Sequence, residues 1–326
     1  MARRILQVLV AEPGASLEDL KRVQLLEALQ HHPGWTLKLW WPPGAPWPVG
    51  SPWQQLVEFH QPWPESEPDL VLLSSAADWQ ARARWYGTRQ LPLLHLLLGA
   101  GPLDWGHGAW QQPALRCCLD GALAQALQQR PDVREPIEVL PLGLDPADLP
   151  PRAPVRQGPP LILGAAHPPL ALAVAQQLQR QGVTAQLVLR ECPLPPLLAA
   201  LAAAPQLLVL APPAPLVPPA PLLELAALAM GLPLVSDRAA EPTGLLQNGR
   251  NALLVESAPE PMAAALLQLR DPLQQPLLQQ LAAGARATAN RQRRAREQQQ
   301  LHQLLDQCEP LWQQACRCHA EASGRW

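Results

Sequence analysis

Residues Leu222 to Val255 read LLELAALAMGLPLVSDRAAEPTGLLQNGRNALLV and form the most informative stretch of the chain. An apolar run that carries Glu224 stops at a Gly-Leu-Pro turn, a short apolar segment follows up to Asp237, and the run GRNALLV closes the stretch. Gly and Pro mark where helices and strands stop. The pattern therefore predicts a buried helix, a tight turn and a buried strand.

Upstream of this stretch the same alternation begins at Leu161. Prolines divide the apolar region from Pro193 to Val235 into short pieces, which favours buried elements over a membrane span. Strands are predicted at Leu161–Gly164, Ala185–Leu189 and Gln206–Leu210, and helices at Pro169–Gln181 and Pro195–Ala203. Strands that alternate with helices indicate a parallel sheet covered on both faces.

The N-terminal half shows the same alternation. Ser16 followed by Asp19 has the form of a capping box, which places a helix start directly after the first strand. Strands are predicted at Ile5–Ala11, Trp35–Trp41, Asp69–Ser74, Leu91–Leu98 and Ile137–Leu142, with a helix at Ala76–Arg84. We expect an N-terminal domain over residues 1–145, a proline-rich linker over 146–160, and a second domain over 161–326 that includes helices from Pro261 onward.

Composition limits the classes of function. The chain has 326 residues, a formal net charge of −2 and a pI near 6.4, so it lacks the positive field that would gather nucleic acid. Six cysteines in a chain of this length are typical of reduced cytosolic thiols. The short apolar N-terminus fits a first buried strand better than a signal peptide. We therefore expect a cytoplasmic protein.

Three segments resemble the retaining GT-B glycosyltransferases of the group 1, family 4-like class. Leu222–Val255 resembles their donor-binding half, whose pattern is a Glu-containing helix, a Gly-hydrophobic-Pro turn, a buried strand, an acidic residue and a later Gly-x-Asn-x-Leu-Leu-Val run. IEVLPLGLDPADLPP, Ile137–Pro151, is similar to the strand and Asn-Gly-Ile-Asp turn that closes their first domain, with Leu142 in place of the Asn. LPLLHLLLGAG, Leu91–Gly101, stands where they have the last long strand of that domain.

The resemblance implies an α/β fold of two Rossmann-like domains, with parallel sheets that face each other across a cleft. It also implies C-terminal helices that cross back onto the first domain. The loops after the first strand of each domain would hold the donor, because helix N-termini there present free N–H groups to phosphate. The donor-binding positions expected on this basis are Gly14, Ser16, Gly164, His167, Arg190, Glu224, Gly231 and Glu241; the catalytic positions are His95 and His107.

The chain departs from the family pattern at two places. The family has two glutamates seven residues apart in the Pro-rich segment, and an ungapped alignment on Gly231 puts Pro218 and Ala226 there. Glu224 replaces the ribose-binding glutamate only if the helix is shifted by a couple of residues. The family's Arg and Lys after the first strand of the second domain are replaced by GAAHPP, which leaves His167, Arg190, Arg238 and Arg250 as substitutes.

Two further patterns admit plain interpretations. Cys308, Cys316, Cys318 and His319 lack the paired spacing of a zinc site, and we expect no metal and no cofactor beyond a nucleotide-sugar substrate. The basic stretch from Arg286 to Arg296 is either a solvated helix face or a peripheral contact with anionic lipid head groups at the inner membrane face.

Three functions stay open. The first is transfer of a sugar from a nucleotide-diphosphate donor to a glycan or lipid-linked acceptor held by the first domain, with no nucleic acid partner. The second is a degenerate GT-B protein that acts as a binding or scaffold module without turnover. The third is another two-domain Rossmann-like enzyme such as an epimerase. Nicotinamide chemistry is disfavoured, because no Gly-x-Gly-x-x-Gly run follows the first strand.

Overall fold

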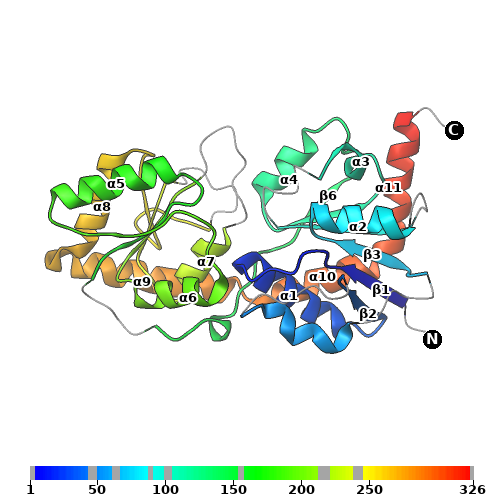
Figure 1. Ribbon diagram of the computed structural model, residues 1–326, viewed down its shortest axis with the longest axis horizontal. Coiled ribbons are helices and arrows are strands. Elements are labelled where there is room, and N and C mark those ends of the chain that lie inside the picture. Colours follow the sequence, from blue (N-terminus) through cyan, green and yellow to red (C-terminus); the bar gives the residue numbers. More distant parts are fainter. Residues whose placement is uncertain are drawn as a thin grey trace. The chain divides into compact units, whose positions relative to one another are not determined.

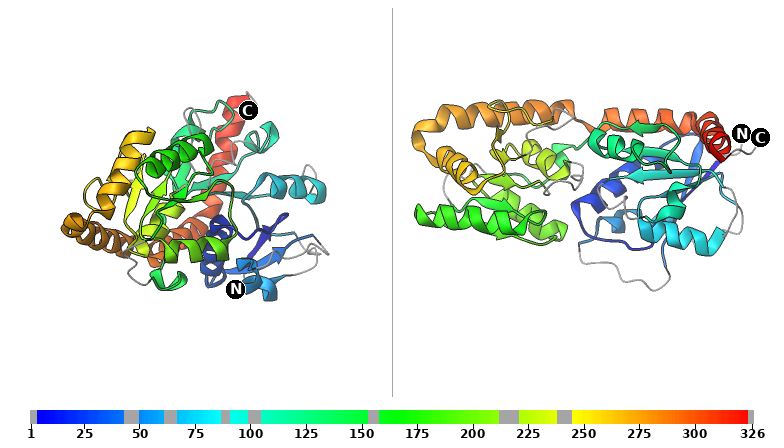
Figure 2. Two further views of the ribbon diagram at one scale, coloured as in Figure 1. Left: turned by 60° about the vertical axis from the view of Figure 1, so that its left-hand side comes forward. Right: turned by 90° about the horizontal axis from the view of Figure 1, so that it is seen from above.

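The computed structural model describes residues 4–42, 50–60, 67–86, 91–98, 105–152, 158–211, 221–237 and 245–323. The chain forms two compact units, drawn in Figures 1 and 2. The first unit comprises Met1–Pro141 together with Ala295–Trp326, and the second comprises Leu142–Arg294. Each unit has its own parallel sheet, and no strand is shared between the two sheets among the described residues.

The first unit is built on a six-stranded parallel sheet in the order β2-β1-β3-β4-β5-β6. Its strands are β1 (Arg4–Leu9), β2 (Trp35–Trp40), β3 (Leu70–Leu73), β4 (Leu93–Leu97), β5 (Leu115–Cys118) and β6 (Ile137–Val139). Its helices are α1 (Leu17–Gln30), η1 (Pro52–Phe59), α2 (Ala76–Tyr86), α3 (His107–Trp110), α4 (Gly121–Gln128), α10 (Arg294–Asp306) and α11 (Cys308–Ser323). The inner strands β3, β4 and β5 are buried along their whole length, as expected for a sheet covered on both faces.

Buried polar contacts hold the C-terminal helices on the first unit. Lys21 of α1 forms a buried ion pair with Glu297 of α10, and His302 Nε2 lies 2.8 Å from the carbonyl oxygen of Ala28. Figure 1 accordingly shows α10 beside α1. At α11, His319 Nε2 lies 2.7 Å from Glu135 Oε2.

The second unit has a five-stranded parallel sheet in the order β11-β10-β9-β7-β8. Its strands are β7 (Leu161–Leu163), β8 (Gln186–Val188), β9 (Leu207–Val209), β10 (Leu234–Ser236) and β11 (Leu253–Leu254). Its helices are η3 (Pro146–Asp148), α5 (Pro168–Arg180), α6 (Leu194–Ala203), α7 (Leu222–Ala229), α8 (Pro259–Arg270), η4 (Pro272–Gln274) and α9 (Gln275–Arg291). In Figure 1, α5 and α8 lie on one side of this sheet, and α6, α7 and α9 lie on the other.

The unit boundaries differ from the expected domain boundaries. The second unit begins at Leu142, so residues 146–160, expected as a linker, belong to it. The second unit ends at Arg294, whereas the expected second domain continues to residue 326. The helices after Arg294 pack on the first unit, which agrees with the crossing-back that the resemblance implied. The predicted strands and helices are confirmed to within a few residues; α3, β5, α4, β11 and the short helices η1, η3 and η4 were not predicted.

Candidate functional site

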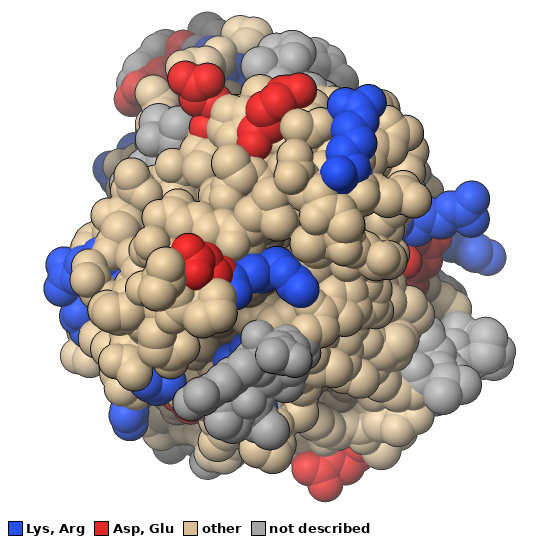
Figure 3. All heavy atoms as spheres, turned by 90° about the vertical axis from the view of Figure 1, so that its left-hand side faces the viewer, with Lys and Arg blue, Asp and Glu red and all other residues tan. Residues whose placement is uncertain are grey.

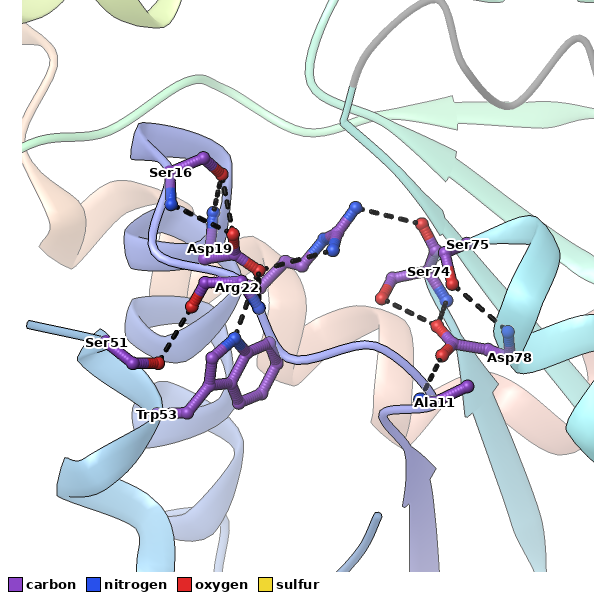
Figure 4. A network of polar contacts seen from close by, with 10 residues as sticks. Ala11, Ser16, Asp19, Arg22, Ser51, Trp53, Ser74, Ser75 and Asp78 are labelled. Carbon is purple, nitrogen blue, oxygen red and sulfur yellow. Dashed lines mark hydrogen bonds and ion pairs between the residues drawn. The ribbon is translucent and has the colours of Figure 1, made fainter. Parts of the chain in front are cut away.

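Loops that follow the strands of a parallel sheet meet at one edge of it, and ligands bind there in most open α/β folds. In the first unit this edge is closed by a carboxylate at the start of α1 (Figure 4). Ser16 caps α1 and forms a capping box with Asp19: the Asp19 N–H donates to Ser16 Oγ at 3.0 Å, and the Ser16 N–H donates to Asp19 Oδ2 at 3.0 Å. Asp19 is only 4% exposed.

The loop before α1 wraps around this carboxylate. Trp53 of η1 donates its indole N–H to Asp19 Oδ1 at 3.0 Å, and the Gly14 N–H donates to the same oxygen at 3.4 Å. A Cβ on Gly14 would lie 2.2 Å from Asp19 Oδ2, so the glycine makes room for the carboxylate of the protein itself. Gly14 and Ser16 therefore face an anion that is already present, and their N–H groups donate to Asp19 instead of being free for a donor phosphate. Their expected donor-binding role stays a prediction.

A second buried carboxylate closes the neighbouring loops. Asp78 of α2 accepts hydrogen bonds from the N–H groups of Ala11, after β1, and Ser74, after β3, at 2.8 and 3.0 Å. Burial raises the pKa of Asp78 above its ordinary value, although these donors and the nearby Arg22 charge oppose the rise. Figure 4 shows Arg22 between the two carboxylates, with Nη1 3.5 Å from Asp19 Oδ1 and Nη2 3.4 Å from the Ser74 carbonyl oxygen.

His95 lies inside the first unit. It is 0% exposed, its ring is surrounded by Trp79, Trp105 and Trp110, and its Nδ1 lies 2.7 Å from Arg116 Nη1. Burial, together with the charges of Arg116 and Arg82, holds the pKa of His95 well below its usual value. The ring is therefore neutral, and because Nδ1 accepts from Arg116 the proton sits on Nε2.

Arg116 joins His95 to the C-terminal helix. The Arg116 side chain is buried, with Nε 2.5 Å from Glu135 Oε1, and Nη2 donates to the carbonyl oxygens of Trp110 and Gln112. Glu135 also contacts His319. Burial raises the pKa of Glu135, but the His319 hydrogen bond and the Arg116 charge outweigh it and hold that pKa below its ordinary value. This network lies in the core of the first unit and gives His95 a structural role. The catalytic role expected for His95 stays a prediction.

In the second unit, the corresponding edge begins with the loop after β7. The Gly164 N–H donates to the Val188 carbonyl at 2.9 Å, and a Cβ on Gly164 would lie 2.2 Å from the Cβ of Ala171 in α5. The glycine is therefore required for the close approach of α5 to the strand. Ala165 and Ala166 after it are exposed, and His167 is half-buried.

The start of α5 offers few N–H groups. Its first two residues, Pro168 and Pro169, have no N–H, and the Leu170 N–H donates to His167 Nδ1 at 3.4 Å. Proline suits the first turn of a helix because its fixed backbone angle starts the helix well. Here the two prolines also remove backbone N–H groups that were expected, from the sequence, to bind the phosphate.

Arg190 and Asp237 lie on the same edge. Arg190 is exposed and follows β8, the neighbour of β7, and the preceding residue, Leu189, comes within 3.4 Å of a Cβ placed on Gly164. Asp237 follows β10; its Oδ1 accepts from the Ala211 N–H at 2.7 Å and its Oδ2 from the Ser257 hydroxyl at 2.8 Å. Asp237 thus ties the ends of β9, β10 and β11 together.

Glu224 lies in the first turn of α7, which begins on the carboxyl side of β9, and it is 2% exposed. Its position places it on the edge that carries Gly164, His167 and Arg190. These four of the expected donor-binding residues therefore share one edge of one sheet.

Gly231 lies elsewhere. It follows the last turn of α7 with φ +63°, where its N–H donates to the Leu228 carbonyl and the next N–H, of Leu232, donates to the Ala227 carbonyl. This is the left-handed turn that glycine favours at a helix end. Gly231 precedes β10 and so lies at the amino end of the sheet, opposite Arg190. The structure thus gives Gly231 a role in ending α7, and its expected donor-binding role stays a prediction.

The GRNALLV run also has a structural role. Asn251 is fully buried and its side chain bonds the backbone of Leu245 and Gln247 and the hydroxyl of Thr288 in α9. Gly284 of α9 lets the chain approach, since a Cβ there would lie 2.0 Å from the Arg250 carbonyl oxygen. The motif docks this loop on α9.

The structure does not test two of the expected site residues, Glu241 and His107. Glu241, like Arg238, lies outside the described residues. His107 begins the short helix α3, and the structure does not describe its side chain.

Other patterns from the sequence are placed as follows. In the described part of the chain, no group of three or more His, Cys, Asp or Glu side chains is arranged to hold a metal ion, and all six cysteines are free thiols. None of the described helices is both long and apolar enough to cross a membrane. Of the arginines from 286 to 296, Arg286 and Arg291 lie in α9, Arg294 and Arg296 lie in α10, and Arg293 lies between the two helices. Arg294 pairs with Asp148. Figure 3 shows charged side chains scattered over one face, without an extended area of one sign.

The sequence matches no protein family model and no curated protein sequence. The structure is similar to a sucrose-phosphate synthase from Thermosynechococcus elongatus, with 14% identity over 94% of this chain and 99% of that one and a TM-score of 0.65. It is also similar to Anabaena HepE in complex with UDP-glucose (14% identity, 93% and 99% of the chains, TM-score 0.65). A third likeness is to a glycosyltransferase from Rickettsia africae (13% identity, 95% and 99%, TM-score 0.60). The two parallel-sheet units thus form a GT-B fold.

Proposed function

We propose that the protein transfers a sugar from a nucleoside-diphosphate donor to a hydroxyl group of a glycan or lipid-linked glycan. The donor binds at the carboxyl edge of the second sheet. Support comes from the fold, which is shared with a structure titled as a UDP-glucose complex. The observation that carries the proposal is the exposed Arg190 loop beside the Gly164–His167 loop, at the ends of adjacent parallel strands.

Each residue has a defined task in this proposal. Arg190 pairs with the diphosphate and stabilises its charge as the bond to the sugar breaks, so electrostatic stabilisation is the main catalytic contribution. Glu224 accepts hydrogen bonds from the ribose hydroxyls. Gly164 brings α5 close to β7, and His167 caps α5.

The first unit contributes no phosphate site in this proposal. Asp19 and Asp78 already occupy the N–H groups at the ends of β1 and β3, and a phosphate there would meet buried negative charge. In this proposal the first unit binds the acceptor, and it does so with residues outside the loops that Asp19 and Asp78 hold.

A second function is a GT-B module that binds a nucleotide without turnover. The specific observation in its favour is the pair of prolines at the start of α5, which leaves Arg190 with little help in stabilising a leaving diphosphate. The two functions differ in one measurement: the transferase releases the nucleoside diphosphate from a bound nucleotide sugar, and the module does not.

Titration calorimetry with UDP, GDP and ADP tests binding, and release of the diphosphate from the matching nucleotide sugar tests turnover. Arg190→Ala should weaken binding about tenfold, which corresponds to about 1.4 kcal/mol. Arg180→Ala is the matched control, because Arg180 is exposed at the other end of α5. Equal affinities for both variants and the unmodified protein would contradict the proposed site.

Glu224→Gln tests the ribose contact. It removes a charged acceptor and should weaken binding about tenfold or more. Glu309→Gln, an exposed carboxylate of α11, is the control and should leave affinity unchanged. An affinity of Glu224→Gln within about twofold of the unmodified protein would remove Glu224 from the site.

A further inference from the structure

The loop over residues 245–252, which precedes β11, contains the one Asn-Gly pair of the chain. The sequence has three asparagines, Asn248, Asn251 and Asn290, and only Asn248 is followed by a glycine, Gly249. The residue after an asparagine controls how fast the side-chain amide is lost, because the backbone nitrogen of that residue is the attacking group. Glycine hinders the attack least, since it has no side chain and adopts the widest range of backbone angles.

Loss of the amide from Asn248 consumes one water molecule and releases ammonia. The Gly249 nitrogen, after giving its proton to the solvent, attacks Cγ of Asn248; a C–N bond forms, the Cγ–Nδ2 bond breaks, and ammonia leaves. Water then opens the resulting five-membered succinimide ring. Cleavage of the bond between Cγ and nitrogen gives aspartate, and cleavage of the bond between the backbone carbonyl carbon and nitrogen gives isoaspartate. Asn248 is exposed, so water reaches it.

In the folded chain both reacting groups are engaged in hydrogen bonds. The Gly249 N–H donates to the Ala252 carbonyl oxygen at 2.9 Å, so the attacking nitrogen keeps its proton in that bond. Asn248 Oδ1 accepts from the Leu254 N–H of β11 at 3.0 Å, which fixes the orientation of the amide group. The Gly249 carbonyl oxygen also accepts from Gln280 Nε2 of α9 at 2.6 Å. The attack requires the first two of these hydrogen bonds to break.

Further contacts hold the same loop closed. Asn251 is buried, and its Nδ2 donates to the Thr288 hydroxyl of α9 at 3.0 Å. Asn248 forms an isolated β-bridge with Ala252, and Gly249 has φ +70°, which glycine adopts without strain. Exposure of the Gly249 nitrogen to solvent therefore breaks several contacts together and is a local unfolding event.

We propose that Asn248 is a modification site, which deamidates to aspartate and isoaspartate at a rate set by opening of the loop over residues 245–252. Aspartate keeps an acceptor oxygen for the Leu254 N–H, so this product returns to the folded loop. Isoaspartate places one more methylene group in the backbone before Gly249 and displaces its N–H from the Ala252 carbonyl, so the loop stays open. This proposal is independent of the proposed function.

Peptide mass mapping of the unmodified protein tests the proposal. One sample is kept at pH 8 in buffer and a second at the same pH in guanidinium chloride that unfolds the chain. Asn248 should deamidate at least about tenfold faster in the unfolded sample, because the loop contacts no longer limit it. In that sample Asn251 and Asn290, which precede residues with side chains, should react more slowly than Asn248. Equal rates for Asn248 in the two samples, or no excess over the other two asparagines, would overturn the proposal.

Thr288→Val tests the role of loop opening. It removes the hydroxyl that Asn251 contacts and should raise the rate at Asn248 in the folded protein about threefold or more, since a lost hydrogen bond favours opening. Thr184→Val is the matched control, because Thr184 is exposed and lies outside this loop, and its rate should equal that of the unmodified protein. An unchanged rate in folded Thr288→Val would contradict the proposal. If circular dichroism shows that Thr288→Val does not fold, the comparison of the two samples of unmodified protein decides.

Discussion

The two units keep their charge in different places. Among the described residues, the first unit buries nine charged side chains and the second unit buries one, Glu224. The nine are Asp19, Lys21, Asp78, Arg82, Arg116, Asp120, Asp132, Glu135 and Glu297. Aromatic residues are divided in the same way, because all 12 Trp, Tyr86 and Phe59 lie in the first unit. In the first unit buried charge serves the fold; in the second, every described charged side chain except Glu224 stays at least partly exposed, where a ligand can meet it.

This difference makes the first unit separately observable. Tryptophan fluorescence reports on the first unit alone, because the second contains no tryptophan. The second unit can be followed by circular dichroism or hydrogen exchange. The stability of variants in the first unit can therefore be measured by fluorescence, and that of variants in the second unit by circular dichroism or hydrogen exchange.

The largest effect is expected for Arg116→Ala. Truncation leaves Glu135 buried without its guanidinium partner, and loss of one partner of a buried pair typically costs about 3–5 kcal/mol. Urea unfolding followed by fluorescence measures it. The exposed Arg180→Ala should change stability by less than about 0.5 kcal/mol. A loss below about 1 kcal/mol for Arg116→Ala would show that the buried charges do not hold the first unit together.

Gly164→Val probes packing in the second unit. The new Cβ would overlap Ala171, and overpacking of this kind costs about 1–3 kcal/mol. Ala165→Val, one residue further along and exposed, is the control. Urea unfolding followed by circular dichroism should separate the two variants, and equal stabilities would mean that the loop can move aside. Because Gly164 supports the fold, loss of nucleotide binding in Gly164→Val would not by itself locate the donor.

Asp19→Ala should destabilise the first unit by about 2 kcal/mol. It removes the capping box of α1 and the acceptor of the buried Trp53 N–H. Asp19→Asn keeps one acceptor oxygen and should lose less. If both variants unfold at the same urea concentration as the unmodified protein, Asp19 is free to serve a ligand and the first-unit loop regains its place as a donor site.

The pH dependence of the first unit is the smallest effect. The folded pKa of Glu135 lies below its ordinary value of 4.5, so its contribution to stability is present above that value and is lost as the pH falls through the folded pKa. The stability difference between the unmodified protein and Glu135→Gln should therefore shrink on acidification. The raised pKa of Asp78 has the opposite effect: the contribution of Asp78 to the stability of the folded state is lost as the pH rises through the folded pKa. A constant difference for Glu135→Gln from pH 7 to pH 3 would contradict this assignment.

Periodicity and proline spacing predict the strands of both described sheets except β5 and β11, and most of the longer helices, since buried parallel strands read as short apolar runs. The Ser16–Asp19 capping box could also be predicted from the sequence. That Asp19 takes up the N–H groups of the loop before α1 could not. Only the structure shows that Trp53, 34 residues away from Asp19, donates to the same carboxylate and closes the loop to phosphate. Arg116, Glu135 and His319 lie far apart in sequence, and no local pattern connects them. The turn at Gly231 could not be recognised from the sequence, because a glycine that ends a helix and a glycine that contacts a ligand look alike there. The prolines that follow His167 are visible in the sequence and argue against a phosphate site at the start of α5.

The central claim is that the carboxyl edge of the second sheet, and not that of the first, receives the nucleoside diphosphate. Hydrogen exchange measured by mass spectrometry, with and without saturating UDP, GDP or ADP in the presence of Mg²⁺, tests it most directly. We predict slower exchange in peptides that cover residues 164–170 and 189–194, and no change in residues 11–16. Protection confined to residues 11–16 and 74–78, or no protection with any of the three nucleotides, would contradict the account.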